Sequence, residues 1–290
     1  RPKNERRRVA PKALAPLGRE AGHSWPVGDG AQRQGGTMSV GSHLWRLAAL
    51  LLVCFLALQL YFVARIALMT VVAPQSTTFQ RSEMWRLLSE TGRITWGQQW
   101  VSDERLGKNI KRAVIASEDS GFADHSGVDW EAMERAWERN QRAQEQADKR
   151  NDRAMKRNPD KPIVPVSAKV VGASTITQQL AKNLFLSGER TPLRKGQELV
   201  LTYALETLLS KQRILEIYLN HVEWGEGLFG AQAAARYYFR TDAAQLGVTQ
   251  AARLAVMLPA PKRFEKRIGS AYLLDRAATV SARMGAVEVP

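Results

Sequence analysis

One continuous apolar segment stands out in the hydropathy pattern of the chain. Residues 47–64 read LAALLLVCFLALQLYFVA, in which Gln59 is the only clearly polar residue, and the apolar character continues to Pro74. At about 1.5 Å per residue, a helix of this length is near the minimum that crosses a bilayer core. We therefore predict a transmembrane signal anchor over residues 46–73. A buried core helix is the alternative, and a cleaved signal peptide is disfavoured because no small-x-small cleavage site follows.

The segment before the anchor is basic and lacks an apolar period. Residues 1–37 are rich in Arg, Pro and Gly, so we expect residues 1–45 to form a disordered basic N-terminus. The positive-inside rule places this end in the cytoplasm and everything after about residue 75 on the other side of the membrane. Met38 stands just before the anchor, and we expect it to be the natural start, with residues 1–37 not native.

Beyond the anchor, apolar residues recur three and four positions apart, which is the helical period. Leu201, Leu205 and Leu208 form one such stripe, and TITQQLAKNLFL and TQAARLAVMLPAPKRF carry the same spacing. No strand-like alternation persists for long, so the pattern predicts a mainly α domain over residues 75–290. Residues 76–112, with three Trp and mixed charges, are interpreted as a short linker that leads into the edge of this domain.

Residues 128–156 are prone to form a helix and densely charged, but their apolar stripe ends after Trp137. Such a segment is either an exposed helix or a mobile insertion. Three prolines, at 159, 162 and 165, then interrupt any helix. We predict a flexible, charged surface loop over about residues 141–170.

The chain of 290 residues carries a formal charge of +14, with a pI of about 10.2. This balance indicates an anionic partner, which could be nucleic acid, a phospholipid surface or a phosphorylated substrate. Cys54 is the only cysteine, so no disulfide forms within the chain. The four histidines are too scattered for a zinc site, and the S-x-x-K and K-T-G motifs of penicillin-type acyl transfer are absent.

The segment AVIASEDSGFADHSGVDW places acidic residues directly after a short apolar run. A carboxylate among apolar neighbours has a raised pKa and can act as a general base or acid, although a surface acid is the commoner reading. Two carboxylates in different environments are typical of glycosidic chemistry. Glu118 and Glu198 are the candidate pair.

Two further segments carry polar residues at suggestive spacings. In GASTITQQLAKN, Thr175 and Gln178 form a capping-box pattern that predicts a helix from about Ile176, with Gln178 and Lys182 on one face. In ERTPLRKGQE, cations cluster close to Glu198, either as a surface ion pair or as a cradle for a diphosphate. These cations are Arg190, Arg194 and Lys195. Taken alone, each segment favours the ordinary structural interpretation.

Five motifs in fixed order behind one apolar helix are more specific than any one of them: EDSGFADHSGVD, GASTITQQLAKN, RKGQE, KQRILEIYLNHVEWGEGLFG and AAARYYF. Over about residues 80–285 the chain resembles the peptidoglycan glycosyltransferases of glycosyltransferase family 51. Because no transpeptidase domain follows, it resembles the monofunctional members. The resemblance implies a mainly α, lysozyme-like fold with a head and a jaw lobe behind one N-terminal transmembrane helix. The implied reaction polymerises lipid II into β-1,4 glycan strands and releases undecaprenyl diphosphate.

The resemblance also assigns roles by motif position. Glu118 matches the base that takes the proton from the acceptor's 4-hydroxyl, and Glu198 matches a second essential carboxylate that orients a phosphate-binding cation or a metal. Lys182 and Arg190 match diphosphate-binding positions. The other implied substrate-binding residues are Ser174, Thr175, Gln178, Gln179, Arg194 and Lys195. The residues expected to shape the cleft are Asp119, Phe122, His125, Asn183 and Asn220.

The resemblance implies that no cofactor is required, although Mg²⁺ or Mn²⁺ can stimulate such enzymes, and no metal site is predicted. The expected partners are lipid II, the nascent glycan chain, the membrane and proteins of cell wall synthesis or division, and not nucleic acid. The expected location is the bacterial inner membrane, with a periplasmic catalytic domain. Two alternatives stay open: a lysozyme-like enzyme that cleaves glycan, and a membrane-tethered basic protein that binds nucleic acid.

Overall fold

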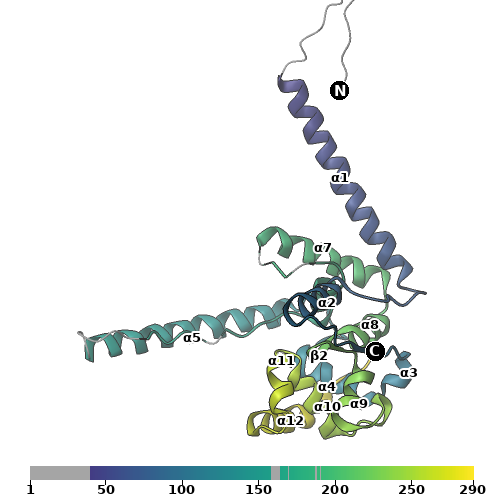
Figure 1. Cartoon of the computed structure of the whole chain (residues 1–290). Coiled ribbons are helices and arrows are strands. Elements are labelled where there is room, and N and C mark those ends of the chain that lie inside the picture. Colours follow the sequence, from purple (N-terminus) through teal and green to yellow (C-terminus); the bar gives the residue numbers. More distant parts are fainter. Residues whose placement is uncertain (1–39, 158–163, 169, 187, 190) are drawn as a thin grey trace, which may run out of the picture. The chain divides into compact units, whose positions relative to one another are not determined.

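The computed structural model describes residues 40–157, 164–168, 170–186, 188–189 and 191–290 (Figure 1). The predictions for residues 1–37 and for Met38 lie outside these residues. The chain divides into two compact units, Arg1–Leu52 and Val53–Pro290, and the candidate chemistry lies in the second.

The anchor predicted over residues 46–73 is a helix, α1 (Val40–Leu68), and Gly41–Leu68 is long and apolar enough to cross a membrane. The helix begins at Val40, which corrects the disorder expected for residues 40–45. Its last turns belong to the second unit, because Ile66 is fully buried in the core there. Gln59 exchanges two side-chain hydrogen bonds with Gln197, of 3.1 and 3.0 Å, and Phe62 meets Phe185 edge-on. The end of the anchor is therefore packed on the domain.

The second unit is mainly helical, as the sequence predicts. Its helices are α2 (Thr78–Thr91), α3 (Asp103–Leu106), α4 (Lys108–Glu118), α5 (Trp130–Arg157), α6 (Ile176–Phe185), α7 (Pro192–Leu208), α8 (Lys211–His221), α9 (Ala231–Phe239), α10 (Val248–Met257), α11 (Pro261–Phe264) and α12 (Ala271–Arg283). Short 3₁₀ helices cover Ala243–Gln245, Glu265–Arg267 and Met284–Ala286.

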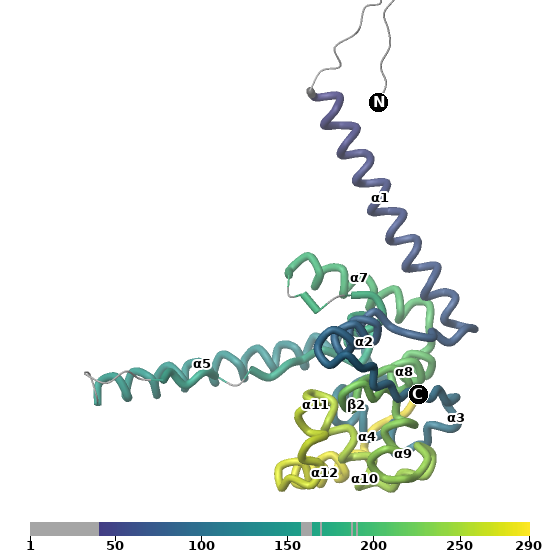
Figure 2. The backbone as a smooth tube through the Cα atoms, viewed as in Figure 1, coloured from purple at the N-terminus to yellow at the C-terminus, as the bar shows by residue number. Residues whose placement is uncertain are grey.

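The core surrounds α4, which packs against α10 and α12 (Figure 2). Ile110, Val114 and Ile115 of α4 are fully buried, because their helical spacing turns one face inward along its whole length. Trp224 is also fully buried, and its indole N–H donates to the Leu254 carbonyl at 3.0 Å. The α4 helix thus carries Glu118, at its last position, from the centre of the core to the edge.

A small three-stranded sheet, in the order β1-β3-β2, joins segments far apart in sequence. Strand β1 (Gly97–Gln98) runs parallel to β3 (Leu228–Phe229), which pairs antiparallel with β2 (Glu223–Gly225). The sequence predicts no strand in this region. Strands of two or three residues are too short to show an alternating pattern, so the sheet had no sequence signal.

The structure corrects the expected linker over residues 76–112, because residues 78–91 form α2. Thr77 and Gln80 make a capping box at its start, and Gly92 ends it in the left-handed conformation, with φ of 68°. These two signals are as clear as those at α6, and both are typical helix boundaries.

The structure also corrects the flexible loop expected over residues 141–170, since α5 remains helical through Arg157. Ala, Gln, Glu, Lys and Arg dominate this stretch, and all are good helix formers. The returning chain lies along the helix, because the side chains of Asn140 and Asn151 each exchange two hydrogen bonds with the backbone, at Val171 and Val166 respectively. These bonds replace part of the apolar packing that the sequence lacks.

Gly227→Ala should destabilise the second unit. Gly227 has a φ of 69°, and a Cβ there would overlap with the Thr95 carbonyl oxygen, while its own carbonyl accepts from Gly97 at 2.9 Å. We expect the free energy of unfolding to fall by about 1–3 kcal/mol, measured by urea unfolding of the detergent-solubilised chain. Gly285→Ala is the control, because no atom lies within 4 Å of its Cβ position. Equal stability of the two variants would contradict this account of the turn.

Candidate functional site

Glu118 stands at the C-terminal end of α4, half-buried, on the wall of a cavity of about 990 Å³, hereafter the first cavity. Burial raises the pKa of its carboxyl above the ordinary value. Hydrogen bonds from Gln179, at 3.1 Å, and Ser117, at 3.4 Å, oppose this rise, and the charge of Asp119 adds to it. The setting is that of a carboxylate whose raised pKa makes it a better proton acceptor than an exposed acid.

A buried hydrogen-bond chain fixes the partner of Glu118. The fully buried Tyr218 donates its hydroxyl to the amide oxygen of Gln179 at 2.9 Å, which turns the amide N–H groups toward Glu118. Burial raises the pKa of Tyr218 well above its ordinary value, so the hydroxyl remains a donor. Nothing local distinguishes Tyr218 from a core residue, because its place on α8 follows the ordinary apolar period.

Asp119 joins the loop after α4 to the start of α6. Its Oδ2 accepts the backbone N–H of Ile176 at 2.9 Å, and its Oδ1 lies 2.8 Å from Nε2 of His125. Nδ1 of His125 accepts the N–H of Gly127 at 3.1 Å, so the network assigns the remaining proton to Nε2, which donates to Asp119. Phe122 is fully buried beneath Lys211, whose Nζ lies 4.5 Å from the ring centroid. These residues shape the loop and hold it in place.

The predicted start of α6 is confirmed. Thr175 caps the helix by accepting the N–H of Gln178, and Gln178 returns its side chain to the Thr175 N–H, each at 3.1 Å. The Thr175 hydroxyl also donates to the Gly127 carbonyl at 2.6 Å. The cap therefore ties α6 to the loop that follows Glu118.

A second cavity, of about 410 Å³, opens between α2, α6 and α7. Gln179, the partner of Glu118, is one of its lining residues, so the carboxylate stands close to both cavities. The predicted site residues on its wall are Ser174, Gln178, Gln179, Lys182, Asn183, Arg194, Lys195 and Glu198. Arg190 lies outside the described residues.

Glu198 is buried on α7 with a cation at each carboxylate oxygen. Lys195 contacts Oε1, and Nη1 of Arg194 donates to Oε2 at 3.0 Å. Because these pairs span three and four residues of one helix, the sequence spacing anticipated them. The geometry fits a carboxylate that positions cations, and the described residues contain no group of three acids, His or Cys that could hold a metal.

The first cavity has a basic wall that the sequence analysis did not identify. Five cations line it together with Glu118: Lys262, Arg263, Lys266, Arg267 and Arg276. All except Arg276 come from PKRFEKR, directly after the helix that ends at Met257. The run was visible in the sequence, but nothing local indicated that it faces Glu118.

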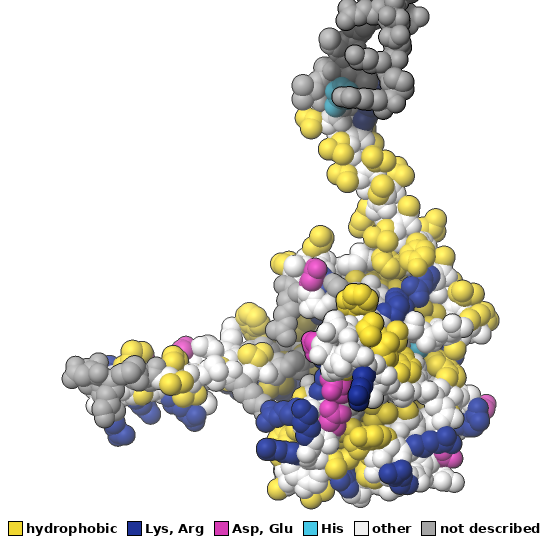
Figure 3. Space-filling model, in the orientation of Figure 1, with side chains coloured by type: hydrophobic (Ala, Val, Ile, Leu, Met, Phe, Trp, Pro, Cys, Tyr) yellow, Lys and Arg dark blue, Asp and Glu magenta, His cyan; other side chains and the backbone are white. Residues whose placement is uncertain are grey.

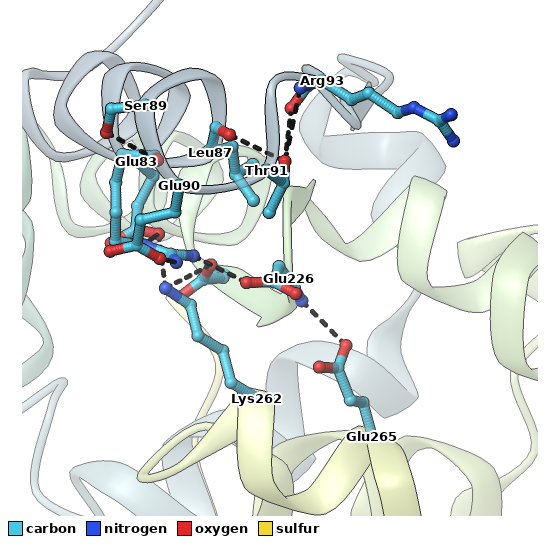
Figure 4. Close-up of polar contacts among 11 residues, drawn as sticks. Glu83, Leu87, Ser89, Glu90, Thr91, Arg93, Glu226, Lys262 and Glu265 are labelled. Carbon is cyan, nitrogen blue, oxygen red and sulfur yellow. Dashed lines mark hydrogen bonds and ion pairs between the residues drawn. The ribbon is translucent and has the colours of Figure 1, made fainter.

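Lys262 links the two cavities through a network of charges (Figure 4). From α11 it pairs with Glu83 of α2, which lines the second cavity, and it lies 3.6 Å from Glu223. Arg86 binds Glu83, Glu90 and Glu226 at 2.9, 2.6 and 2.7 Å. Burial raises the pKa of Glu223 to about 7, although Lys262 lowers it. The network holds α11, which lines the first cavity, against α2, which lines the second.

Asn220, predicted to shape the cleft, lines neither of these two cavities. It is fully buried, and its side chain bonds both backbone groups of Val101, at 2.9 and 3.0 Å. Its position fits a structural role in attaching the segment before α3 to α8.

Comparison with known proteins gives a consistent result. A family model described as Transglycosylase matches residues 87–148 and 162–285. A biosynthetic peptidoglycan transglycosylase of Burkholderia orbicola (strain MC0-3) is 48% identical over 236 residues, which cover 81% of this chain and 87% of that protein. The protein of the same description from Paraburkholderia phytofirmans is 46% identical over 245 residues, covering 84% of this chain and 92% of the relative.

Replacing Glu223 should change how stability depends on pH. Because its pKa in the folded state is about 7 rather than 4.5, the fold binds this proton more tightly than the unfolded chain does. The resulting stabilisation is complete below the unfolded pKa and is lost as the pH rises through the folded value. Glu223→Gln should therefore raise the free energy of unfolding by roughly 1–3 kcal/mol at about pH 8.5, and by little at about pH 5.

The measurement is urea unfolding of both proteins across that pH range. Glu226→Gln is the control, because Arg86 lowers the pKa of this exposed carboxyl, and its removal should bring no gain at high pH. If Glu223→Gln changed stability equally at both pH values, Glu223 would not titrate as described.

Proposed function

Because the chain belongs to the transglycosylase family, we propose that it is a membrane-anchored peptidoglycan glycosyltransferase that polymerises lipid II into β-1,4 glycan strands. One observation carries the proposal: a half-buried carboxylate, Glu118, stands next to two cavities lined by cations. A reaction that joins two lipid diphosphate-linked sugars needs two anion-binding regions and a base between them.

The proposed reaction places the donor in the second cavity and the acceptor in the first. The 4-hydroxyl oxygen of the acceptor's N-acetylglucosamine attacks the anomeric carbon of the donor's N-acetylmuramic acid. The bond from that carbon to the diphosphate oxygen breaks, the configuration inverts from α to β, and Glu118 takes the hydroxyl proton. Burial raises the pKa of this carboxyl, and the hydrogen bonds from Gln179 and Ser117 favour the ionised form that a base needs.

The leaving group is undecaprenyl diphosphate, and its charge is stabilised by the cations of the second cavity. Lys182, Arg194 and Lys195 line that cavity. Cations fixed where negative charge develops lower the barrier without a general acid. We propose that Glu198 holds Arg194 and Lys195 in position, and that Arg190 contributes by its place in the sequence.

We propose that no metal is required, since these cations supply the positive charge. Mg²⁺ or Mn²⁺ could reach Glu198 only by displacing a bound cation, because Lys195 and Arg194 already contact its two oxygens. Stimulation by either ion would then reflect its binding to the diphosphate of the substrate.

The anchor supports the choice of a lipid-linked donor. Gln59, within the apolar run of α1, is bonded to Gln197 of α7, and α7 also carries Arg194, Lys195 and Glu198. The second cavity therefore lies beside a helix that can cross a membrane. We propose that the chain sits in the inner membrane with its N-terminus cytoplasmic and its catalytic domain periplasmic, close to its substrate and to other cell wall synthesis proteins.

Glu118→Gln should lower polymerisation by about 100-fold or more, because the amide cannot accept the proton. The assay is purified full-length chain with lipid II, with the glycan products separated on a gel. Glu104→Gln, at an exposed position outside both cavities, is the control and should retain activity. Polymerisation retained in Glu118→Gln would contradict the assignment of the base. Cleavage of finished glycan, without polymer formed from lipid II, would instead favour the lysozyme-like alternative.

The acid limb of the pH–rate profile should depend on Gln179. Protonation of Glu118 stops the reaction, and its raised pKa places the limb above the ordinary carboxyl value of 4.5. Gln179→Leu removes the hydrogen bond that favours the carboxylate, so the limb should move to higher pH. Tyr218→Phe removes the hydroxyl that orients the Gln179 amide but leaves the amide in place. This variant should therefore shift the acid limb less than Gln179→Leu does. An unchanged limb in Gln179→Leu would show that this hydrogen bond does not set the pKa of the base.

A further inference from the structure

The α5 helix has two unlike edges. Trp130, Met133, Trp137 and Met155 fall within a narrow sector by the helical period, and their exposed fractions are 57%, 38%, 66% and 54%. We call α5, together with the returning residues 164–168, 170 and 171, the arm. Figure 3 shows hydrophobic side chains along one edge of the arm and Lys and Arg along the other. Gln144 and Asp148 fall in the same sector between Trp137 and Met155, so the exposed Trp and Met form two groups along this edge. Exposed side chains of this size are costly in water, so the edge requires an explanation.

The returning chain adds further exposed apolar side chains beside α5. Val164, Val166 and Val170 alternate along it, with exposed fractions of 88%, 50% and 73%. Asn140 and Asn151 fix this segment to α5 through its backbone, which leaves the valine side chains outside. We call this surface, from Trp130, Met133, Trp137 and Met155 to the three valines, the apolar edge.

The opposite edge is an ordinary solvated face. It carries Arg135, Arg139, Arg142, Arg150 and Arg153. Two of them are paired at 3.1 Å with acids one turn earlier, Arg135 with Glu131 and Arg142 with Glu138. Hydrated i, i+4 pairs of this kind need no partner outside the helix.

The outer end of the arm carries further charge. Residues 149–157 contain five cations and one acid, and residues 149–161 lie outside both segments matched by the family. By the helical period, Lys149 and Lys156 stand on the flank between the two edges, and nearer the domain the same flank carries Glu131, Glu138 and Glu145. From a flank, long Lys side chains can reach a surface that the apolar edge rests upon.

We infer that the arm lies on the surface of the lipid bilayer. Its apolar edge would lie at the boundary between the headgroups and the acyl chains, and Lys149 and Lys156 would reach anionic headgroups. Three observations favour lipid over other occupants. Among the described helices, α5 combines the strongest amphipathicity with low overall hydrophobicity, which is the signature of a helix lying in the interface. Trp is the side chain most suited to that depth. The chain also carries a helix that can cross a membrane, so a bilayer is always within reach.

Both segments that join the arm to the rest of the domain lie at the candidate site. Asp129, at the end of the Glu118 loop, accepts the N–H of Ala132 in the first turn of α5 at 2.7 Å. The returning chain leads through Ser174, on the wall of the second cavity, into the cap of α6. Contact with lipid would therefore orient both walls at once. This inference goes beyond the proposed function and depends only on membrane anchoring.

The test uses the full-length chain with Cys54→Ala and one new cysteine, either Met155→Cys on the apolar edge or Gln146→Cys on the opposite edge. Each carries an environment-sensitive fluorophore and is reconstituted in vesicles of phosphatidylethanolamine and phosphatidylglycerol containing a lipid with a nitroxide in its acyl chain. Both variants share α1, so any difference between the labels reports the arm. The label at 155 should shift to shorter wavelength and be quenched roughly twofold or more beyond the label at 146. Adding Trp137→Ser should weaken the quenching at 155.

Weak and equal quenching at both positions would overturn the inference, because the arm would then stand in water. Protection of the label at 155 that rises with protein density, without quenching by lipid, would assign the apolar edge to a second copy and equally overturn it. Neither result depends on glycosyl transfer, so failure here is distinct from failure of the proposed function.

Discussion

The position of the candidate base depends on one buried carboxylate beside it. Asp119 takes up the N–H of Ile176, one of the helix-start donors that no residue within α6 can satisfy. The same side chain holds His125 and so the shape of the loop after α4. Since residues 119 and 176 are far apart in the chain, this bond brings together the end of the helix that carries Glu118 and the start of the helix that carries Gln179. The bond therefore helps to keep Glu118 and Gln179 within hydrogen-bonding distance of each other.

Electrostatics explain why a strongly basic chain keeps acids at its centre. Glu118 and Glu198 are surrounded by cations, but their settings differ. Glu198 is neutralised by direct contacts on both oxygens, whereas Glu118 faces amide and hydroxyl donors and leaves its cations across the cavity. Burial raises the pKa of Glu118, and its neutral donors oppose that rise only in part. The two acids are therefore suited to different tasks, one to holding charge and the other to accepting a proton.

Local sequence rules predicted the parts of the structure that are themselves local. The anchor, the cap at Thr175 and the ion pairs of Glu198 each depend on spacings of at most a few turns. Features formed between distant segments had no such signal: the hydroxyl of Tyr218 behind Gln179, the sheet that joins Gly97 to Leu228, and Lys262 facing Glu83. The prediction of a flexible loop where α5 continues was wrong for a different reason. Its residues favour a helix, but bonds from Asn140 and Asn151 to a backbone segment distant in the sequence hold that helix in place, and no local spacing indicates them.

The amide pair between Gln59 and Gln197 bears on how the anchor is built. Reciprocal hydrogen bonds between two amides have a direction, so they fix the rotation of α1 about its own axis as well as its contact with α7. In an apolar environment, separating the pair would leave four polar groups unsatisfied. The last turns of the anchor and the domain must then tilt and turn as one body. An unrelated apolar helix of equal length would hold the domain at the membrane without controlling the direction in which it faces.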